Sequence, residues 1–387
     1  QSRNAGWSNF LPDAEASASF ADKDQKFNGG TTTSSNPATY QLSIEQPLFA
    51  GFGNISTLNS LENSYKATKA GYDNQTQEIL LNLVSAYFDT LRDQDVLELQ
   101  KNQVKVLEEQ RKATQIRFEE GEVTKTDLKQ AEARLARAKA EKIKAEGDLA
   151  ATEARLEAIV GEDVQHLSWP RLNENNVPND VETVRAMTLA SHPLAVSALA
   201  NLTSRKHNVT AEKSGFYPTV SLVGTMSKNE GVSIGSGSTF DSTEQTVTLQ
   251  VSVPLFKGGA TLAGVREAAS QKREALNDYE NTRRNISEEL TSAFRAYEAA
   301  KASLDAFKQS QEAAKLAAEG ITREAELGER SVLDVLDVQQ DLLEAQVDVV
   351  RGKRDVAVTQ ARLLAAMGRL NADSLMPVES GSTVAAQ

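Results

Sequence analysis

The sequence repeats itself, and this duplication constrains the fold more than any other feature. The segment Gln46-Pro-Leu-Phe49 recurs as Val253-Pro-Leu-Phe256, so that the two prolines lie 207 residues apart. The same offset relates Ala86 to Ala293, Gly121 to Gly328, Asp127 to Asp334, Leu156 to Leu363, and Gly161 to Gly368. One offset over more than a hundred residues indicates a duplicated structural unit. We therefore expect the two halves to fold alike.

The duplication also predicts a gap at the start of the first half. Phe10-Leu-Pro12 matches Phe216-Tyr-Pro218, and a helical stretch at about 181–214 precedes only the second of these motifs. By comparison of the halves, roughly 25 residues of the first repeat are missing. We expect that a signal peptide was lost together with this helix.

Each half contains segments in which apolar and polar residues alternate, within 10–49 and 216–256. Alternation gives a strand one apolar and one polar face. Loops rich in Asn, Gly, Ser and Thr are expected near 22–38 and 228–243. Two surface hairpins on a soluble protein would explain these patterns. In a membrane, however, a sheet must close, and four strands are too few because small barrels have about eight. Membrane strands would therefore require several chains to share one barrel.

Four helical segments without proline follow the strands. Two of them, 55–120 and 262–327, are each about 99 Å long at 1.5 Å per residue. The shorter segments, 125–160 and 332–367, show a seven-residue rhythm of apolar rows that is typical of left-handed coiled coils. Each half is thus predicted to form a long helical hairpin, within 55–160 and 262–367. A coiled-coil stalk would explain the rhythm, but not the strands.

Composition excludes several functions. The chain has 42 basic and 54 acidic residues, for a net charge of −12, whereas nucleic-acid binding requires a basic surface. There is no cysteine, which excludes disulfides and thiolate metal sites. No run of 18 apolar residues is present, so no transmembrane helix is expected. No set of nucleophile, base and orienting residue is apparent, so we expect neither an enzyme nor a cofactor or metal site.

Together, these features resemble the TolC family of outer-membrane efflux and secretion channels. The motifs that carry the resemblance are Leu11-Pro12, Gln46-Pro-Leu-Phe49, Arg117-Phe-Glu-Glu-Gly121, Ser191-His-Pro193, Tyr217-Pro218, Val253-Pro-Leu-Phe256 and Ser331-Val-Leu-Asp-Val-Leu-Asp337. The resemblance implies a mainly α fold with membrane β: a homotrimer whose chains share a twelve-stranded β-barrel, four strands per chain, that continues into a long α-helical coiled-coil barrel. It also implies the outer membrane of a Gram-negative bacterium, with the helices extending into the periplasm.

The resemblance further implies a belt around the tunnel and an entrance at the hairpin tips. The belt would comprise 161–215 and 368–387, ending in a flexible tail. The tips lie near 119–127 and 326–334. At the entrance, Asp334 and Asp337 are expected to ring the narrowest point and to favour cations. Both Ser331-x-x-Asp334 and Thr124-x-x-Asp127 also have the form of a capping box, which would explain Asp334 without a role in the pore.

Arg330 is similar to a family arginine that ties the entrance shut, and the partners of that arginine correspond to Thr126 and Asp127. A solvated turn charge is the simpler interpretation of Arg330. The hairpin-tip residues Gly121, Glu122, Gly328 and Glu329 are expected to dock a periplasmic adaptor, which in turn binds an inner-membrane transporter.

The sequence therefore predicts a passive exit duct of a tripartite efflux pump or a type I secretion system, which conducts small molecules or unfolded protein. The alternative is a structural or adhesive coiled-coil fibre with a β anchor. The sequence does not decide between drugs and secreted protein as cargo.

Overall fold

The computed structural model describes residues 6–26, 32–162, 164, 167–170, 177–178, 180–234 and 238–371. Residues 372–387 lie outside the described residues, and they include the tail 377–387 that the sequence predicts to be flexible. The chain divides into two compact units, and each unit is built from both halves of the sequence. One unit comprises 1–71 and 194–282, and the other comprises 72–193 and 283–387.

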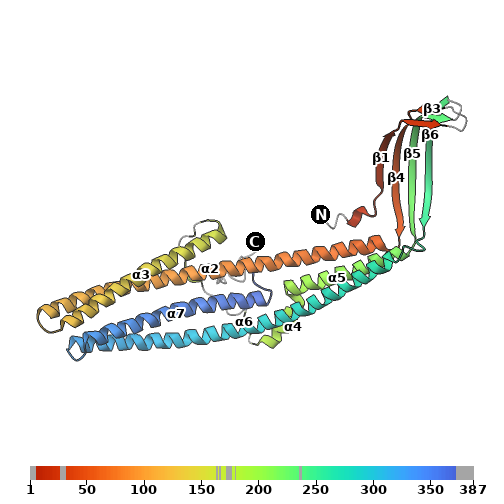
Figure 1. Ribbon diagram of the computed structural model, residues 1–387. Coiled ribbons are helices and arrows are strands. Elements are labelled where there is room, and N and C mark those ends of the chain that lie inside the picture. The colour runs from red at the N-terminus through yellow and green to blue at the C-terminus, as the bar shows by residue number, and fades with distance from the viewer. Residues whose placement is uncertain are drawn as a thin grey trace, which may run out of the picture. The chain divides into compact units, whose positions relative to one another are not determined.

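The first unit contains a four-stranded antiparallel sheet with the strand order β1-β4-β5-β6 (Figure 1). Its strands are β1 (Asp13–Phe20), β4 (Ala38–Ala50), β5 (Thr219–Ile234) and β6 (Ser238–Ser252). The central pair, β4 and β5, joins the two halves of the sequence. The register shifts between Pro47 and Phe49, where the proline ring removes a backbone donor from the ladder.

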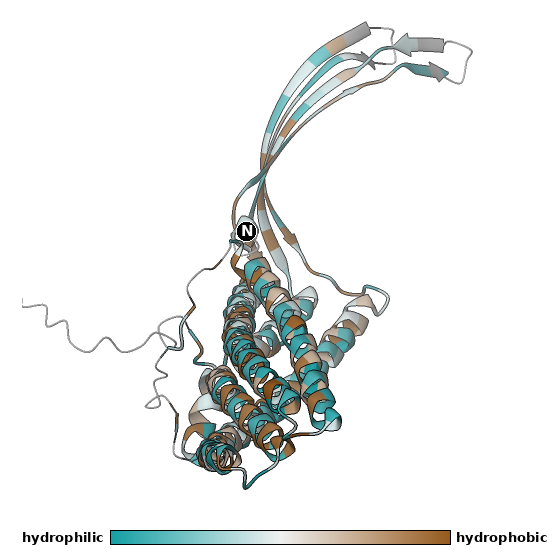
Figure 2. Ribbon diagram, turned by 90° about the vertical axis from the view of Figure 1, so that its left-hand side faces the viewer, coloured by the Kyte–Doolittle hydropathy of each residue, from teal (hydrophilic) through white to brown (hydrophobic). Residues whose placement is uncertain are grey.

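The sheet has one apolar and one polar face, because its register aligns the alternating residues of neighbouring strands. Leu42 lies opposite Ala16 on one side and Met226 on the other, and Leu222 lies opposite Leu249. Figure 2 shows hydrophilic and hydrophobic residues alternating along the strands. The apolar face is uncovered in the single chain, as the 61% exposure of Leu249 indicates.

The strands occupy more of the chain than the sequence patterns predicted. Two short antiparallel strands, β2 (Lys23–Lys26) and β3 (Thr32–Ser35), lie in the segment expected to be a loop. Strands β5 and β6 likewise continue into the second expected loop. Their Ser and Thr residues lack apolar alternation, yet β-branched Thr is favourable in strands, and backbone pairing with a neighbouring strand supplies the remaining stabilisation.

Two helices of 67 residues each, α2 (Gly53–Glu119) and α6 (Ala260–Glu326), contribute to both units. In the first unit, α2 packs against α5 (Pro193–Lys213) through small side chains. The Ser60 and Ser204 hydroxyls are 2.8 Å apart, and the Ser197 hydroxyl donates to the carbonyl of Ala67. None of the described helices contains an apolar stretch long enough to cross a bilayer.

The second unit is helical and includes α3 (Lys125–Val160), α4 (Val181–Ser191) and α7 (Val332–Ala366). Among the described residues, many of its buried side chains gather in three hydrophobic clusters. The first joins α4, α6 and α7 and includes the fully buried Leu290 and Leu363. The second joins α2 to α7, and the third joins α2, α3 and α7. Every cluster contains residues of α7, which makes this helix the centre of the unit's core.

Candidate channel entrance

The two hairpin turns have the same backbone structure. Gly121 and Gly328 both have φ of 80°, a left-handed conformation that glycine adopts without steric cost. The next amide donates back to the last helical turn, from Glu122 to the Arg117 carbonyl and from Glu329 to the Glu324 carbonyl. This is the Schellman arrangement that ends many helices. The four residues expected to dock an adaptor, Gly121, Glu122, Gly328 and Glu329, are exposed.

A capping box starts each helix after its turn. The Thr124 amide and hydroxyl donate to the Asp127 carboxylate at 2.9 and 2.8 Å. The Ser331 amide and hydroxyl donate to Asp334 at 3.1 and 2.8 Å. These hydrogen bonds favour the ionised carboxylates and hold the pKa of Asp127 and of Asp334 below its ordinary value. Both aspartates therefore act as helix caps in the single chain.

Asp337 has a different partner, which the sequence analysis did not identify. Its carboxylate accepts a hydrogen bond from Arg134 of α3 at 2.7 Å, so the ion pair joins the two hairpins. Beside it, α2, α3 and α7 enclose a polar groove of about 310 Å³. Arg134 lies 203 residues before Asp337, and neither the duplication nor helical spacing relates them. No sequence signal could have predicted this pair.

Arg330 lies at the predicted position but binds within its own hairpin. Its Nε atom donates to Glu324 at 2.8 Å, and this hydrogen bond raises the pKa of Arg330. In the part of the chain that the structure describes, its hydrogen-bond partner is thus Glu324 and not Thr126 or Asp127. Thr126 is exposed.

The second tip also presents an apolar side chain that the sequence analysis missed. Leu327 is 77% exposed, and its counterpart in the first half is Glu120. An exposed leucine on a charged hairpin tip offers an apolar contact to a binding partner. The position of Leu327 directly before the turn glycine Gly328 is the sequence feature that could have predicted its exposure.

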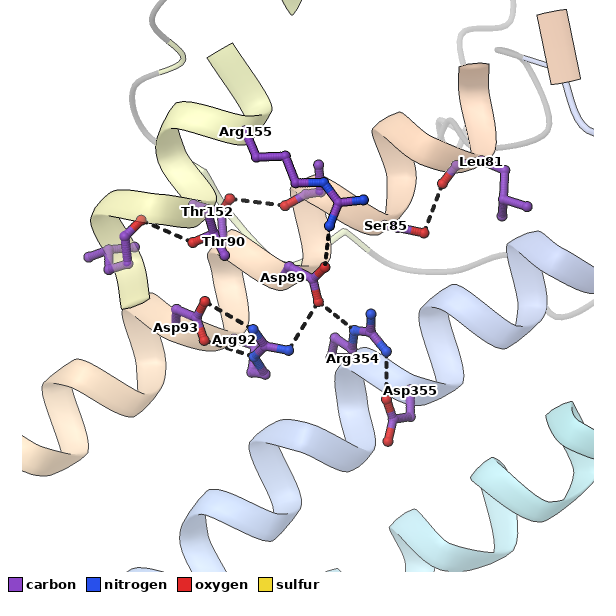
Figure 3. A network of polar contacts seen from close by, with 12 residues as sticks. Leu81, Ser85, Asp89, Thr90, Arg92, Asp93, Thr152, Arg155, Arg354 and Asp355 are labelled. Carbon is purple, nitrogen blue, oxygen red and sulfur yellow. Dashed lines mark hydrogen bonds and ion pairs between the residues drawn. The ribbon is translucent and has the colours of Figure 1, made fainter. Parts of the chain in front are cut away.

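A second polar site lies away from the tips, where α2, α3 and α7 meet (Figure 3). Asp89 accepts hydrogen bonds from Arg92 at 3.0 Å and from Arg354 of α7 at 2.8 Å. Arg155 of α3 lies 3.9 Å from the same carboxylate. Arg92 also binds both oxygens of Asp93, at 2.8 and 3.0 Å, and this pairing raises the pKa of Arg92.

This network is buried and well satisfied. Asp89 and Asp93 are each 7% exposed, and two arginines neutralise them. Breaking such a group of ions costs more than it contributes when intact, because an unpaired buried charge remains. The network therefore connects α2 to α7 through the Asp89–Arg354 pair. Sequence reasoning missed it because Arg354 lies 265 residues from Asp89.

The polar sites described above consist of charged groups held by ion pairs and hydrogen bonds. Within the described ranges, no group of three or more His, Cys, Asp or Glu residues is placed to hold a metal ion. The carboxylates at these sites are paired with arginines or belong to capping boxes.

Comparison with solved structures shows which fold the chain has. The outer-membrane channel CmeC of Campylobacter jejuni superposes with a TM-score of 0.81 at 21% identity, over 98% of this chain and 81% of that structure. A membrane protein from Pseudomonas aeruginosa gives a TM-score of 0.84 at 19% identity, over 95% and 86% of the two chains. The fold class predicted from the sequence is confirmed: the chain has the fold of the outer-membrane channels, mainly helical with membrane strands.

The sequence matches the family described as outer membrane efflux protein over residues 1–162 and 184–369, and the chain belongs to this family. The outer membrane efflux protein BepC of Brucella suis is 30% identical over 340 residues, which are 87% of this chain and 73% of BepC. The alkaline protease secretion protein AprF of Pseudomonas aeruginosa is 27% identical over 83% of this chain and 68% of AprF. The predicted function and location are confirmed: the chain is an exit duct of the outer membrane. The family is one of channels, which favours the duct over the fibre.

Proposed function

We propose that three copies of the chain assemble into one duct. Their twelve strands close in the outer membrane, and their helical hairpins form a tunnel into the periplasm. A periplasmic adaptor and an inner-membrane transporter deliver cargo to the tunnel, which conducts it passively and catalyses no reaction. The names of BepC and AprF refer to efflux and to protease secretion, so both small molecules and unfolded proteins are candidate cargo.

The open sheet is the observation that carries this proposal. Among the residues that the structure describes, strands β1 and β6 each pair with a neighbour on one side only, and Val247 on the apolar face of β6 is 78% exposed. In hydrocarbon, an open sheet edge leaves backbone groups without hydrogen bonds, at several kcal/mol each. Pairing β1 of one copy with β6 of the next removes every edge. Four strands are too few, because small barrels have about eight.

At the tips, we place the entrance constriction at Asp334 and Asp337. The Arg134 ion pair neutralises Asp337 in the single chain, so cation preference depends on how far this pair opens. The latch proposal requires Arg330 to exchange Glu324 for Thr126 and Asp127 of a neighbouring hairpin. All these side chains are solvent-accessible, which permits such an exchange at low cost.

We also propose that the adaptor docks on the tips. Gly121, Glu122, Gly328 and Glu329 would provide backbone and charged contacts, and Leu327 would provide the apolar one. Replacing Leu327 with Glu, the residue found at its counterpart position, should weaken adaptor binding and leave conductance unchanged. Unchanged binding would remove Leu327 from the interface.

Mass measurement in mild detergent and single-channel recording in planar bilayers test the duct together. We expect a trimer that conducts ions without added energy. A folded monomer, or a trimer without conductance, would contradict the proposal.

Double replacement of Asp334 and Asp337 with Ala tests the constriction. We expect weaker block by multivalent cations, because the carboxylates that attract them are gone. Glu153→Ala, which removes an exposed carboxylate near the end of α3 that is distant from the tip, is the matched control and should leave block unchanged. Equal block in all three proteins would place the constriction elsewhere.

Arg330→Ser tests the latch separately. We expect a higher resting conductance with the trimer intact, and a smaller effect when Asp127→Ala is already present, as coupled neighbours show. If conductance stays at the wild-type level, Arg330 is a solvated turn charge.

A further inference from the structure

Within one chain, α2 and α7 pack along a dry contact, which we term the α2–α7 seam. Its buried residues are Val84, Phe88 and Leu91 of α2, and Ala357, Ala361 and Leu364 of α7. The Asp89 network extends this seam, with Arg354 reaching from α7 to α2 (Figure 3). Burial of these apolar side chains and ions holds the two helices together.

The duplication defines a second seam with the same geometry. An offset of 207 residues maps α2 onto α6 and maps α3 onto α7. In a ring of identical copies, the first half of each copy lies beside the second half of the same copy. That second half lies in turn beside the first half of the next copy, and the two junctions are equivalent in geometry. Helix α6 of one copy would then meet α3 of its neighbour as α2 meets α7. This step rests on the proposed trimer.

The residues that would form this second seam differ in kind. Polar side chains take the place of four apolar ones: Thr291 for Val84, Arg295 for Phe88, Glu298 for Leu91, and Glu157 for Leu364. The buried charges are missing as well, with Ala296 for Asp89, Ala299 for Arg92, Ala300 for Asp93, and Gly147 for Arg354. The second seam therefore has neither the dry cluster nor the buried network.

These polar residues are uncovered in the single chain. The Arg295 side chain is 70% exposed and pairs with Glu298 of its own helix at 2.7 Å. Glu157 is exposed, as are its α3 neighbours Ala150 and Ala154. A surface with these charges is stable in water, and it also carries complementary charges for a second copy.

We propose that neighbouring copies pair Arg295 of α6 with Glu157 of the partner copy's α3. Phe88 and Leu364, whose positions they take, belong to one buried cluster, so the equivalent positions would also meet. Arginine and glutamate there have opposite charge, and Arg295 would exchange Glu298 for Glu157 of the neighbour. The seam between copies is thus polar and salt-sensitive, whereas the seam inside each copy is dry.

Cross-linking tests this pairing directly, because the chain has no cysteine of its own. The double variant Arg295→Cys, Glu157→Cys is treated with a short bismaleimide in the assembled trimer. We expect dimer and trimer bands on denaturing gels, and loss of these bands in either single variant. The pair Glu108→Cys, Lys139→Cys is the matched control, because these exposed side chains form an ion pair within one chain. It should cross-link within that chain and leave only monomer bands.

Charge reversal supplies a second readout. Arg295→Glu should lower the temperature at which the trimer dissociates, and adding Glu157→Arg should restore it. High salt should reduce this difference. An intact, conducting trimer without cross-links between copies, or without rescue in the double reversal, overturns the pairing and leaves the proposed duct standing. A wild-type chain that is monomeric in detergent overturns both.

Discussion

Helices α3 and α7 occupy equivalent positions in the two halves, yet they differ in burial. Both begin with a capping box, and they have 36 and 35 residues. Five residues of α3 are buried, whereas fifteen residues of α7 are buried, so α7 contributes to all three core clusters. The duplication has preserved the length and the caps of the helix, but only α7 is surrounded within its own chain.

The same difference separates the two long helices. Phe88 of α2 is 4% exposed in a dry cluster with Trp169, whereas its counterpart Arg295 on α6 faces solvent. Equivalent positions have therefore diverged according to whether the neighbouring helix belongs to the same chain. Four predictions test this comparison.

The largest effect is expected for Phe88→Ala. Truncating a buried phenylalanine removes apolar contacts and leaves a cavity, so the free energy of unfolding should fall by about 3–5 kcal/mol. Arg295→Ala, the equivalent change on α6, should cost clearly less, because the ion pair with Glu298 that it removes is exposed and contributes at most about 1 kcal/mol. Guanidinium denaturation followed by circular dichroism measures both. Equal losses would mean that the two seams do not differ.

Arg92→Ala should have the next largest effect. It leaves Asp93 buried without the arginine that binds both its oxygens, at a cost of about 3 kcal/mol. Arg351→Ala is the matched control, because Arg351 is a largely exposed arginine paired with Asp348 on the same helix, and should cost less than about 1 kcal/mol. A similar cost for both would show that the network contributes nothing specific.

Removal of the caps should have a smaller and equal effect in the two halves. Thr124→Ala and Ser331→Ala each remove an N-cap side chain, which typically contributes about 1 kcal/mol. Because the two capping boxes are alike, the two losses in denaturation experiments should agree. A much larger loss for Ser331→Ala would indicate that the α7 start has a further partner.

The smallest effect concerns pH. Burial lowers the pKa of His192, which is 5% exposed at the end of α4. The unfolded chain then binds the proton more readily, so stability is complete above the ordinary pKa of about 6.5 and falls as the pH drops below it. His192→Gln should remove the contribution of His192 to the loss of stability between pH 7.5 and 5.5. The control variant His207→Gln should retain that contribution. Identical slopes for wild type and His192→Gln would contradict the assignment.

Local patterns predicted most of the fold. Seven-residue rows of apolar residues indicated α3 and α7, the sequences after Gly121 and Gly328 indicated the capping boxes, and alternation indicated the four long strands. These features depend on neighbours within about one helical turn or two strand residues, so they are visible in sequence. The short strands β2 and β3 were missed because they depend on pairing with each other.

The sequence by itself determined the duplication, the hairpins, the position of Asp334 as a cap and, through its resemblance, the class of channel. Only the tertiary structure decided the partners of the charged groups that join distant helices: Arg134 for Asp337, and Arg354 for Asp89. An ion pair between distant helices depends on how those helices pack, and any of the 42 basic residues is chemically able to bind a given carboxylate. Spacing along the chain carries no information about that choice.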